Sequence, residues 1–192
     1  MLNMGKTRPP RLVTPLVAIL AAKPACFQAA RKPLEALLGP VELESPFYPF
    51  EKTAYYTPSM GEGLLRQFLS FVNLHDPVVL VDWKLATNVL EEELKPSLQI
   101  AGDPERPINL DPGYITGAKL VLASTKDFAH RLYIRDGIFA EITMGFRGDS
   151  WVSHDFTFPD YKNGTYHAFF KRVRDRHLRK IKEFRRDQEE SR

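Results

Sequence analysis

Hydrophobic and polar residues alternate along this chain with two periods, one of two residues and one near 3.6 residues, typical of strands and helices respectively. These periods predict the order strand, helix, strand, strand, helix, strand. The predicted ranges are 12–22, Pro24 to Gly39, 41–47, 65–73, Pro77 to about Lys95, and an extended segment within 107–124. This order is that of a split β-α-β unit, so we expect an α+β protein with a ferredoxin-like β-α-β-β-α-β core.

Both predicted helices are bounded by residues with restricted backbones or capping side chains. Pro24 suits the first turn of the first helix and Gly39 its end, whereas Pro33 inside it predicts a kink or a break. Asp76 is the expected cap of the second helix, and Pro96 is expected to stop it.

The second helix carries two stripes with different chemistry. The apolar stripe, expected to face the core, is Val78, Val81, Leu85 and Val89. The polar stripe, spaced i, i+3, i+4 and i+7, is Lys84, Thr87, Asn88 and Glu91. One interpretation is a solvated face with a charge pair. The other is that Lys84 and Asn88 turn toward Asp111 and donate hydrogen bonds to a ligand.

A β-hairpin is predicted around Asp136 and Gly137, because a type I′ turn needs positive φ at both central residues. The flanking runs AHRLYIR and IFAEITMGF are rich in β-branched and aromatic residues. A two-residue loop sets the register, which places His130 and Glu141 diagonally on one face, with Cβ atoms roughly 7–8 Å apart. Arg131 is then expected on the opposite face.

Asn109 and Asp111 are two residues apart and project to the same side of the chain if residues 107–111 are extended. Asp111, Pro112 and Gly113 predict a turn, with positive φ at the glycine. Residues 116–124 are interpreted either as a buried strand or as a short helix capped by Thr116.

The densest group of chemically active residues lies between Arg106 and Phe146. The predicted catalytic residues are His130, Glu141 and Asp127, because a carboxylate near an imidazole suits acid–base chemistry. The predicted ligand-binding residues, suited to an anionic group, are Asn109, Asp111, Tyr114, Lys126, Arg131, Lys84 and Asn88. The alternative for His130 and Glu141 is a structural polar pair at the open end of a sheet. No spacing matches a recognised metal motif, and the sequence identifies no cofactor.

We expect a single domain over residues 1–192, with a loose arm at 1–10 and the α+β core and hairpin at 12–147. The loop FEKTAYYTPSMGEG is either a lid over a pocket or a loop that packs its own tyrosines. Residues 148–162 are expected to be an irregular aromatic segment lying across the core. Residues 163–190 predict a helix whose stripe is Tyr166, Phe170, Val173, His177, Ile181 and Phe184.

The net charge of +3 hides an asymmetry along the chain. Residues 162–192 contain eleven Lys and Arg against five Asp and Glu, so the rest of the chain is acidic by three charges. The basic helix therefore suggests nucleic-acid binding through Arg172, Arg176, Arg179 and Lys180. The alternatives are a solvated helix or a partner helix, including one that forms a homodimer.

Composition points to a cytoplasmic protein. The lone Cys26 excludes an internal disulfide framework; it is expected to be a packed residue, although its place near a helix start could lower its pKa. No apolar run is long enough to span a bilayer, and the run 16–22 is too interrupted for a signal peptide.

The segments TAYYTPSMGEGL, KLATNVLEEEL, PINLDPGYIT, KLVLASTKDFAHR and DGIFAEIT resemble a bacterial family described only as a domain of unknown function (DUF4416). The resemblance covers nearly the whole chain. Some members carry the label of GTP-binding protein, but this sequence lacks the G-x-x-x-x-G-K-[ST] phosphate loop.

Two functions are therefore expected as alternatives. The first is a small-molecule binding protein or enzyme acting on an anionic nucleotide, phosphate or carboxylate through the central cluster. The second is an RNA-binding or structural protein that uses the basic C-terminal helix.

Overall fold

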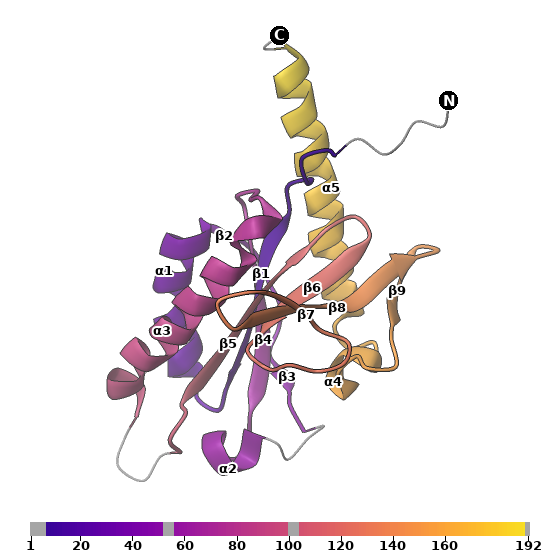
Figure 1. Cartoon of the computed structure of the whole chain (residues 1–192). Helices are drawn as coiled ribbons and strands as arrows, with labels where there is room; N and C mark the ends of the chain where they lie inside the picture. Colours follow the sequence, from indigo (N-terminus) through magenta and orange to yellow (C-terminus); the bar gives the residue numbers. More distant parts are fainter. Residues whose placement is uncertain (1–6, 52–55, 100–103, 191–192) are drawn as a thin grey trace.

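A nine-stranded antiparallel sheet forms the centre of the computed structural model, which describes residues 7–51, 56–99 and 104–190. The strand order is β2-β4-β1-β5-β6-β8-β7, with β3 beside β4 and β9 beside β8 (Figure 1). The strands are β1 Thr14–Ala21, β2 Val41–Glu44, β3 Tyr48–Pro49, β4 Leu65–Phe71, β5 Ile108–Ile115, β6 Lys119–Ser124, β7 Leu132–Arg135, β8 Ile138–Arg147 and β9 Ser150–Ser153. The helices are α1 Pro24–Leu38, α2 Thr57–Met60, the 3₁₀ turn η2 Pro77–Val79, α3 Leu80–Leu98, α4 Pro159–Lys162 and α5 His167–Glu190. This mixture confirms the α+β class, in a sheet larger than the four strands of the predicted core.

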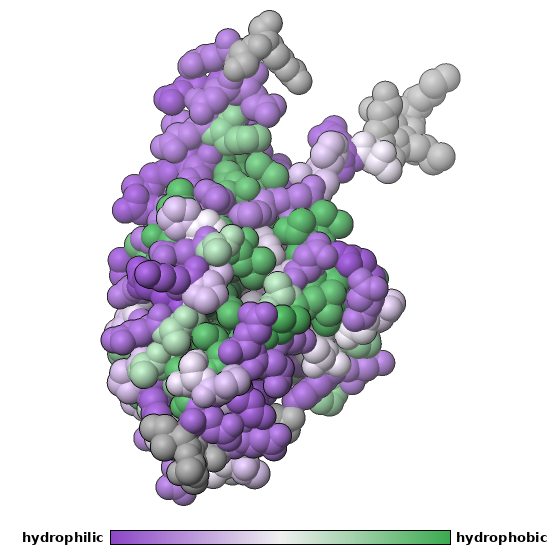
Figure 2. Space-filling model, turned by 90° about the vertical axis from the view of Figure 1, so that its left-hand side faces the viewer, coloured by the Kyte–Doolittle hydropathy of each residue, from purple (hydrophilic) through white to green (hydrophobic). Residues whose placement is uncertain are grey.

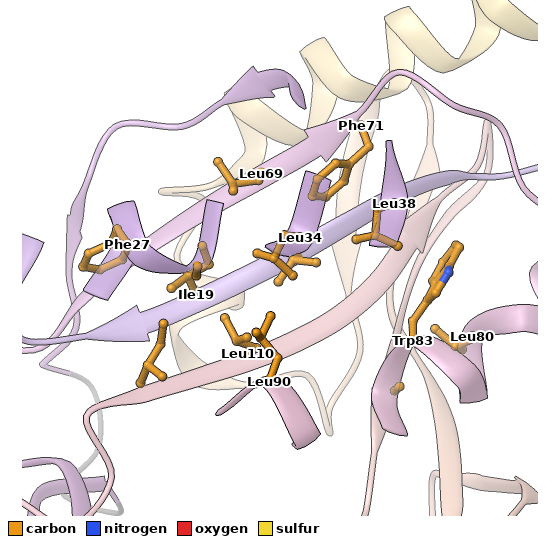
Figure 3. Packing of buried hydrophobic residues seen from close by; sticks show 14 of the residues in the cluster. Ile19, Phe27, Leu34, Leu38, Leu69, Phe71, Leu80, Trp83, Leu90 and Leu110 are labelled. Atoms are coloured by element: carbon orange, nitrogen blue, oxygen red, sulfur yellow. The ribbon is translucent and has the colours of Figure 1, made fainter. Parts of the chain in front are cut away.

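The helices α1 and α3 cover one face of the sheet (Figure 1). Figure 3 shows Phe27, Leu34 and Leu38 of α1 packed with Leu90 of α3 over the strands. The strand residues beneath them include Ile19, Leu69, Phe71 and Leu110. All eight residues of β1 are buried, as expected for a central strand.

The helices α4 and α5 cover the opposite face. Phe68 of β4 lies at the centre of this second core, in ring contact with Tyr161 of α4 and Phe170 of α5. Only the first turns of α5 contribute, because residues 182–190 are all exposed. The predicted stripe of α5 is therefore buried through His177, but its last member, Phe184, is 43% exposed. None of the described helices is both long and apolar enough to cross a membrane.

Several local predictions are confirmed and others are corrected. Asp76 caps η2 by accepting a hydrogen bond from the Val78 amide. Helix α1 continues through Pro33 without a break, and α3 extends two residues past Pro96. Residues 119–124 form strand β6, which rules out the helix interpretation.

The apolar stripe predicted for α3 is wrong. Val81 is fully buried, but Val78, Leu85 and Val89 are 65%, 38% and 56% exposed. The polar stripe instead faces inward, with Lys84, Thr87 and Glu91 buried, so the interpretation as a solvated face is also wrong. Helix α3 therefore exposes Leu85 and Val89 beside charged residues on its outward face and buries the charged Lys84 and Glu91 on its inward face.

The predicted Asp-Pro-Gly turn is also wrong, because Asp111, Pro112 and Gly113 lie inside strand β5. All of β5 pairs with β1, which holds these residues extended. On its other side β5 pairs with β6 only from Gly113 to Ile115. Pro112 has no N–H to donate, so the β6 ladder ends beside it. A side chain at Gly113 would meet the Val121 carbonyl oxygen at 2.2 Å, which explains the glycine. Residues 108–112 of β5 therefore pair with β1 but have no described strand partner on the β6 side, and we call this gap in the sheet the opening.

The hairpin turn is confirmed, with φ of 52° at Asp136 and 75° at Gly137. The register is not the predicted one. A bulge between Tyr133 and Arg135 shifts it, so that Leu132 pairs with Ala140 rather than Glu141. Arg131, which precedes β7, therefore reaches the face that it was predicted to avoid.

The remaining predictions concern loops. Residues 148–162 contain β9 and α4, so the segment is more regular than expected, and its Trp151 and Tyr161 are buried in the core. In the described part of the loop at 50–63, Phe50, Tyr56 and Met60 pack as a satellite cluster. Residues 1–6, 52–55 and 100–103, which include most of the predicted arm and Tyr55, lie outside the described residues.

Candidate functional site

Lys84 of α3 reaches into the opening beside β5. Its ammonium donates hydrogen bonds to the Leu110 carbonyl at 2.9 Å and to Asp111 Oδ1 at 3.2 Å. The Lys84 side chain is 5% exposed and that of Asp111 is 25% exposed. The Lys84 ammonium thus takes the place of a strand partner for the Leu110 carbonyl. It also holds the Asp111 carboxylate, which remains partly exposed to solvent.

Glu91, two turns along α3 from Lys84, completes this replacement. Its Oε1 accepts the Leu110 N–H at 2.7 Å, and its Oε2 accepts two hydrogen bonds from Arg106, at 3.1 and 2.6 Å. Arg106 also donates to Asn109 Oδ1 at 2.5 Å, and Asn109 Nδ2 donates to Asp111 Oδ2 at 2.7 Å. The opening is therefore lined by a continuous chain of charged hydrogen bonds.

Arg66 of β4 joins this group from across the sheet. Leu20 of β1 pairs with Asn109 on one side and with Arg66 on the other, so the three side chains share a face. Two strand spacings separate Arg66 from Asn109, roughly 10 Å between Cα atoms. Arg66 Nη1 donates to Tyr161 Oη at 3.1 Å and lies 3.4 Å from Asp160 Oδ2. We call Lys84, Asn109, Asp111, Arg66 and Tyr161 the Asp111 centre.

One donor of the Asp111 centre is unsatisfied. Arg66 is only 5% exposed, and its Nε is buried without a hydrogen-bond partner among the described residues. A buried donor of this kind normally has a partner, which can be a water or a bound ion.

Electrostatics keep the Asp111 carboxyl ionised and the Tyr161 phenol neutral. Burial opposes ionisation of Asp111, but Lys84, Arg66 and the Asn109 hydrogen bond outweigh it and lower the pKa of that carboxyl. Burial raises the pKa of Tyr161 well above its ordinary value, so its phenol stays protonated. Burial also raises the pKa of Glu91, against the opposing charges of Arg106 and Lys84.

A second group lies on the far side of the opening, around Glu141 of β8. Glu141 Oε2 accepts from Arg131 Nε at 2.7 Å and lies 3.2 Å from His130 Nε2, while Oε1 accepts from Thr143 at 3.1 Å. Arg131 Nη1 donates to Ser124 at 2.7 Å. Ser124 ends β6 two residues beyond Leu122, where the pairing of β6 with β5 stops, so this second group borders the opening from the β6 side.

His130 is held inside a stack of rings. It lies parallel to Phe128 at 6.0 Å and to Phe156 at 4.5 Å, and Phe156 in turn stacks on His154 at 5.1 Å. The His130 side chain remains 21% exposed. This packing and Glu141 together determine where the imidazole nitrogens point.

The structure brings the sequence-predicted residues together in two sets and leaves four elsewhere. Lys84, Asn109 and Asp111 form the first set, and His130, Arg131 and Glu141 form the second. Tyr114 packs on the α1/α3 side, and Asn88 is half-buried on α3. Lys126 and Asp127 are exposed in the loop after β6, where the Lys126 carbonyl accepts a hydrogen bond from Arg131.

The sequence did not predict two members of the Asp111 centre, Arg66 and Tyr161. It also did not predict three residues that contact the centre or β5, namely Asp160, Arg106 and Glu91, which accepts the Leu110 N–H. The available signal was Arg66 itself, a charged residue within the predicted strand LRQFLSF. Within residues 7–51, 56–99 and 104–190 there is no group of three or more His, Cys, Asp or Glu that could hold a metal ion.

The comparisons with known proteins give a family but no activity. The model of the family described as "Domain of unknown function (DUF4416)" matches residues 11–177, and the chain belongs to this family. No curated protein and no solved structure matches.

Proposed function

We propose that the protein binds a small anionic ligand, a carboxylate or phosphate metabolite, at the Asp111 centre. The observation that carries this proposal is the buried Nε of Arg66, which has no partner among the described residues. A planar guanidinium in a water-poor site suits an oxyanion, because its remaining N–H can form a short charge-assisted hydrogen bond.

The other members of the centre add requirements on the ligand. Lys84 has three N–H donors, and two of them are used by Leu110 and Asp111. The Asp111 carboxylate accepts hydrogen bonds and is kept ionised, so it favours a hydroxyl or amino group on the ligand. The proposed ligand therefore carries an anionic group together with at least one neutral or cationic donor.

If the protein is an enzyme, we assign proton transfer to His130 rather than to Glu141 or Asp127. Glu141 already accepts from Arg131, His130 and Thr143 and is 2% exposed, which suits a positioning role. Asp127 is exposed in the loop whose Lys126 and Phe128 carbonyls accept hydrogen bonds from Arg131, and its own side chain is not among the hydrogen-bonded groups of either set. The imidazole is the partly exposed titratable group on this side of the opening.

We also infer that β2, β4, β1 and β5, with α1 and α3 as connections, are a ferredoxin-like unit to which β6–β9 were added. The neighbour order β2-β4-β1-β5 supports this inference. On this interpretation the opening lies where the added strands meet the core.

A thermal-shift screen tests the proposal, with inorganic phosphate, nucleotides, sugar phosphates and dicarboxylates as probes. A ligand present at 100 times its Kd stabilises by about 2.7 kcal/mol, which corresponds to a rise in Tm of roughly 5–10 °C. Asp111→Asn should abolish the rise, and the exposed control Asp127→Asn should retain it. A rise that survives Asp111→Asn would place the site elsewhere.

The C-terminal helix supports a second candidate, nucleic-acid binding. The end of α5 projects from the body, and its surface is mainly hydrophilic with a hydrophobic band (Figures 1 and 2). Arg172, Arg176 and Arg179 are exposed, but Lys180 is held by Glu42 and by the carbonyls of Phe71 and Val72. Changing exposed arginines of this helix to Gln should weaken RNA retention at low salt and reduce its salt dependence. Unchanged retention would exclude this function for the helix.

A further inference from the structure

The outward face of α3 exposes large apolar residues beside the charged Asp82, Glu92 and Glu93. Leu85 and Val89 of α3 are 38% and 56% exposed, and Val78 of the preceding turn η2 is 65% exposed. An ordinary surface helix carries polar residues there. On α3 the inward positions are occupied by Lys84 and Glu91, which satisfy the backbone of β5. The need to fill the opening explains the charged interior but not the exposed apolar residues.

The neighbouring hairpin is apolar on the same side. Leu132 is 73% exposed and pairs with Ala140, which packs against the α1/α3 core, so both side chains point to that side. Ile142, paired with the core residue Val121, is 45% exposed. Ile134, in the bulge of β7, is 47% exposed.

The helix and the hairpin form one continuous surface. Arg135 at the hairpin turn binds Asp82 of α3 at 2.6 Å, and Asp82 lies between Val78 and Leu85 on the outer face. Figure 2 views the molecule from the α1/α3 side and shows hydrophobic residues at its surface. We call this surface the α3–β7 patch: Val78, Leu85, Val89, Leu132, Ile134 and Ile142.

The edge of the sheet adds a second property to the α3–β7 patch. Strand β7 ends the strand order, and no described strand pairs with its outer edge. Exposed edges are normally protected by charged residues or proline, whereas three of the four residues of β7 are large and apolar. A partner that covers the patch can also pair with this edge.

We propose that the α3–β7 patch is a homodimer interface, covered by a second copy of this chain related by a two-fold axis. At roughly 100 Å² exposed per residue, six residues offer roughly 600 Å², the upper size of apolar patches on monomers. Two copies bury roughly 1,200 Å², the lower limit of stable specific interfaces.

Charge and symmetry favour a second copy over a different partner. The charges within the patch are Asp82, Arg135 and Asp136, which include both signs and pair with one another, and the exposed Glu92 and Glu93 lie one turn along α3 from Val89, at the rim of the patch. An edge strand can pair with itself in antiparallel fashion about a two-fold axis, which makes the surface self-complementary.

Sedimentation equilibrium of the full chain tests the proposal. The expected mass is twice the chain mass of 22.0 kDa. Leu132→Glu or Val89→Glu would bury an unpaired carboxylate, so each should raise the dimer Kd at least about tenfold. Phe184→Glu is the matched control, because Phe184 is 43% exposed but lies on α5. It should leave the mass unchanged.

The outcomes separate cleanly. A monomeric wild-type chain at about 0.1 mM, or a dimer that survives both glutamates, overturns the proposal. A dimer broken by Phe184→Glu and not by the patch variants assigns the interface to α5 and overturns it as well. Thermal unfolding checks that each variant still folds. If Leu132→Glu lowers the Tm of the isolated chain, Val89→Glu on α3 decides the result.

Discussion

Replacing Lys84 with Met should destabilise the protein by about 2–3 kcal/mol. The substitution keeps the length and apolar volume of the side chain but removes the ammonium. The Leu110 carbonyl then loses a charge-assisted hydrogen bond at an edge of β5 that has no strand partner, which costs about 1.5–3 kcal/mol. Asp111 adds less, because its side chain is 25% exposed and water can replace part of the lost interaction.

The pH dependence gives a second and independent readout. Lys84, together with Arg66 and Asn109, lowers the pKa of Asp111 in the folded protein below its ordinary value of 3.8, although burial opposes this. The resulting stabilisation is present above pH 3.8 and is lost as the pH falls through the folded pKa. The stability difference between the wild type and Lys84→Met should therefore be largest at neutral pH and shrink below about pH 4.

Urea unfolding from pH 7 to pH 3, followed by circular dichroism, measures both effects. The matched control is Lys95→Met, because Lys95 lies on the same helix and pairs with the exposed Glu105 at 3.7 Å. That change should cost less than about 0.5 kcal/mol. Equal costs for the two lysines, or a cost at Lys84 that does not vary with pH, would refute the role assigned to Lys84.

Three further predictions concern other parts of the molecule. Arg131→Ala should cost about 3 kcal/mol in urea unfolding because it removes the buried cation that pairs with the buried Glu141, whereas His130→Ala should cost less than half as much; the reverse order would contradict the hydrogen bonds seen here. Burial, with Lys180 and Arg174, lowers the pKa of one buried histidine, His177, to about 4. Its folded pKa lies below its unfolded pKa of 6.5, so the wild type should lose about 2 kcal/mol between pH 6.5 and pH 4, and His177→Gln should lose less. Removing residues 183–192 should change Tm by less than about 2 °C, since residues 182–190 are exposed; a larger drop would show that this end is packed.

The sequence predicts the fold best where a local signal and its tertiary context agree. Asp136-Gly137 forms the expected turn, Asp76 caps its helix, and the apolar run beginning at Thr14 is the buried central strand. In each case the residues themselves restrict the backbone, or their hydrophobicity alone determines burial.

The predictions fail where pairing partners override local preference. The Asp-Pro-Gly segment favours a turn, but continuous pairing with β1 keeps it extended, and Pro112 ends the β6 ladder instead. A single bulge at Ile134 shifts the hairpin register, which no turn signal reveals. It brings Arg131 to Glu141, so the second candidate set has a different composition from the predicted one.

The candidate site was only partly predictable, for a related reason. The spacing of Lys84 and Glu91 on one helix face is visible in the sequence, but their burial depends on the gap left by β6. Arg66 is distant from Asp111 in the sequence, and only the strand order β4-β1-β5 places the two on one face.

The most direct test of ligand binding is the NMR signal of the Arg66 Nε–H group, followed during titration with the anion found in the thermal-shift screen. The ligand is expected to accept a hydrogen bond from this group, so its ¹⁵N and ¹H shifts should move saturably with the Kd measured by calorimetry. Asp111→Asn should reduce that movement. An Arg66 signal that stays in place while the ligand binds elsewhere, with His130 or α5 resonances moving instead, would contradict the Asp111 centre as the binding site.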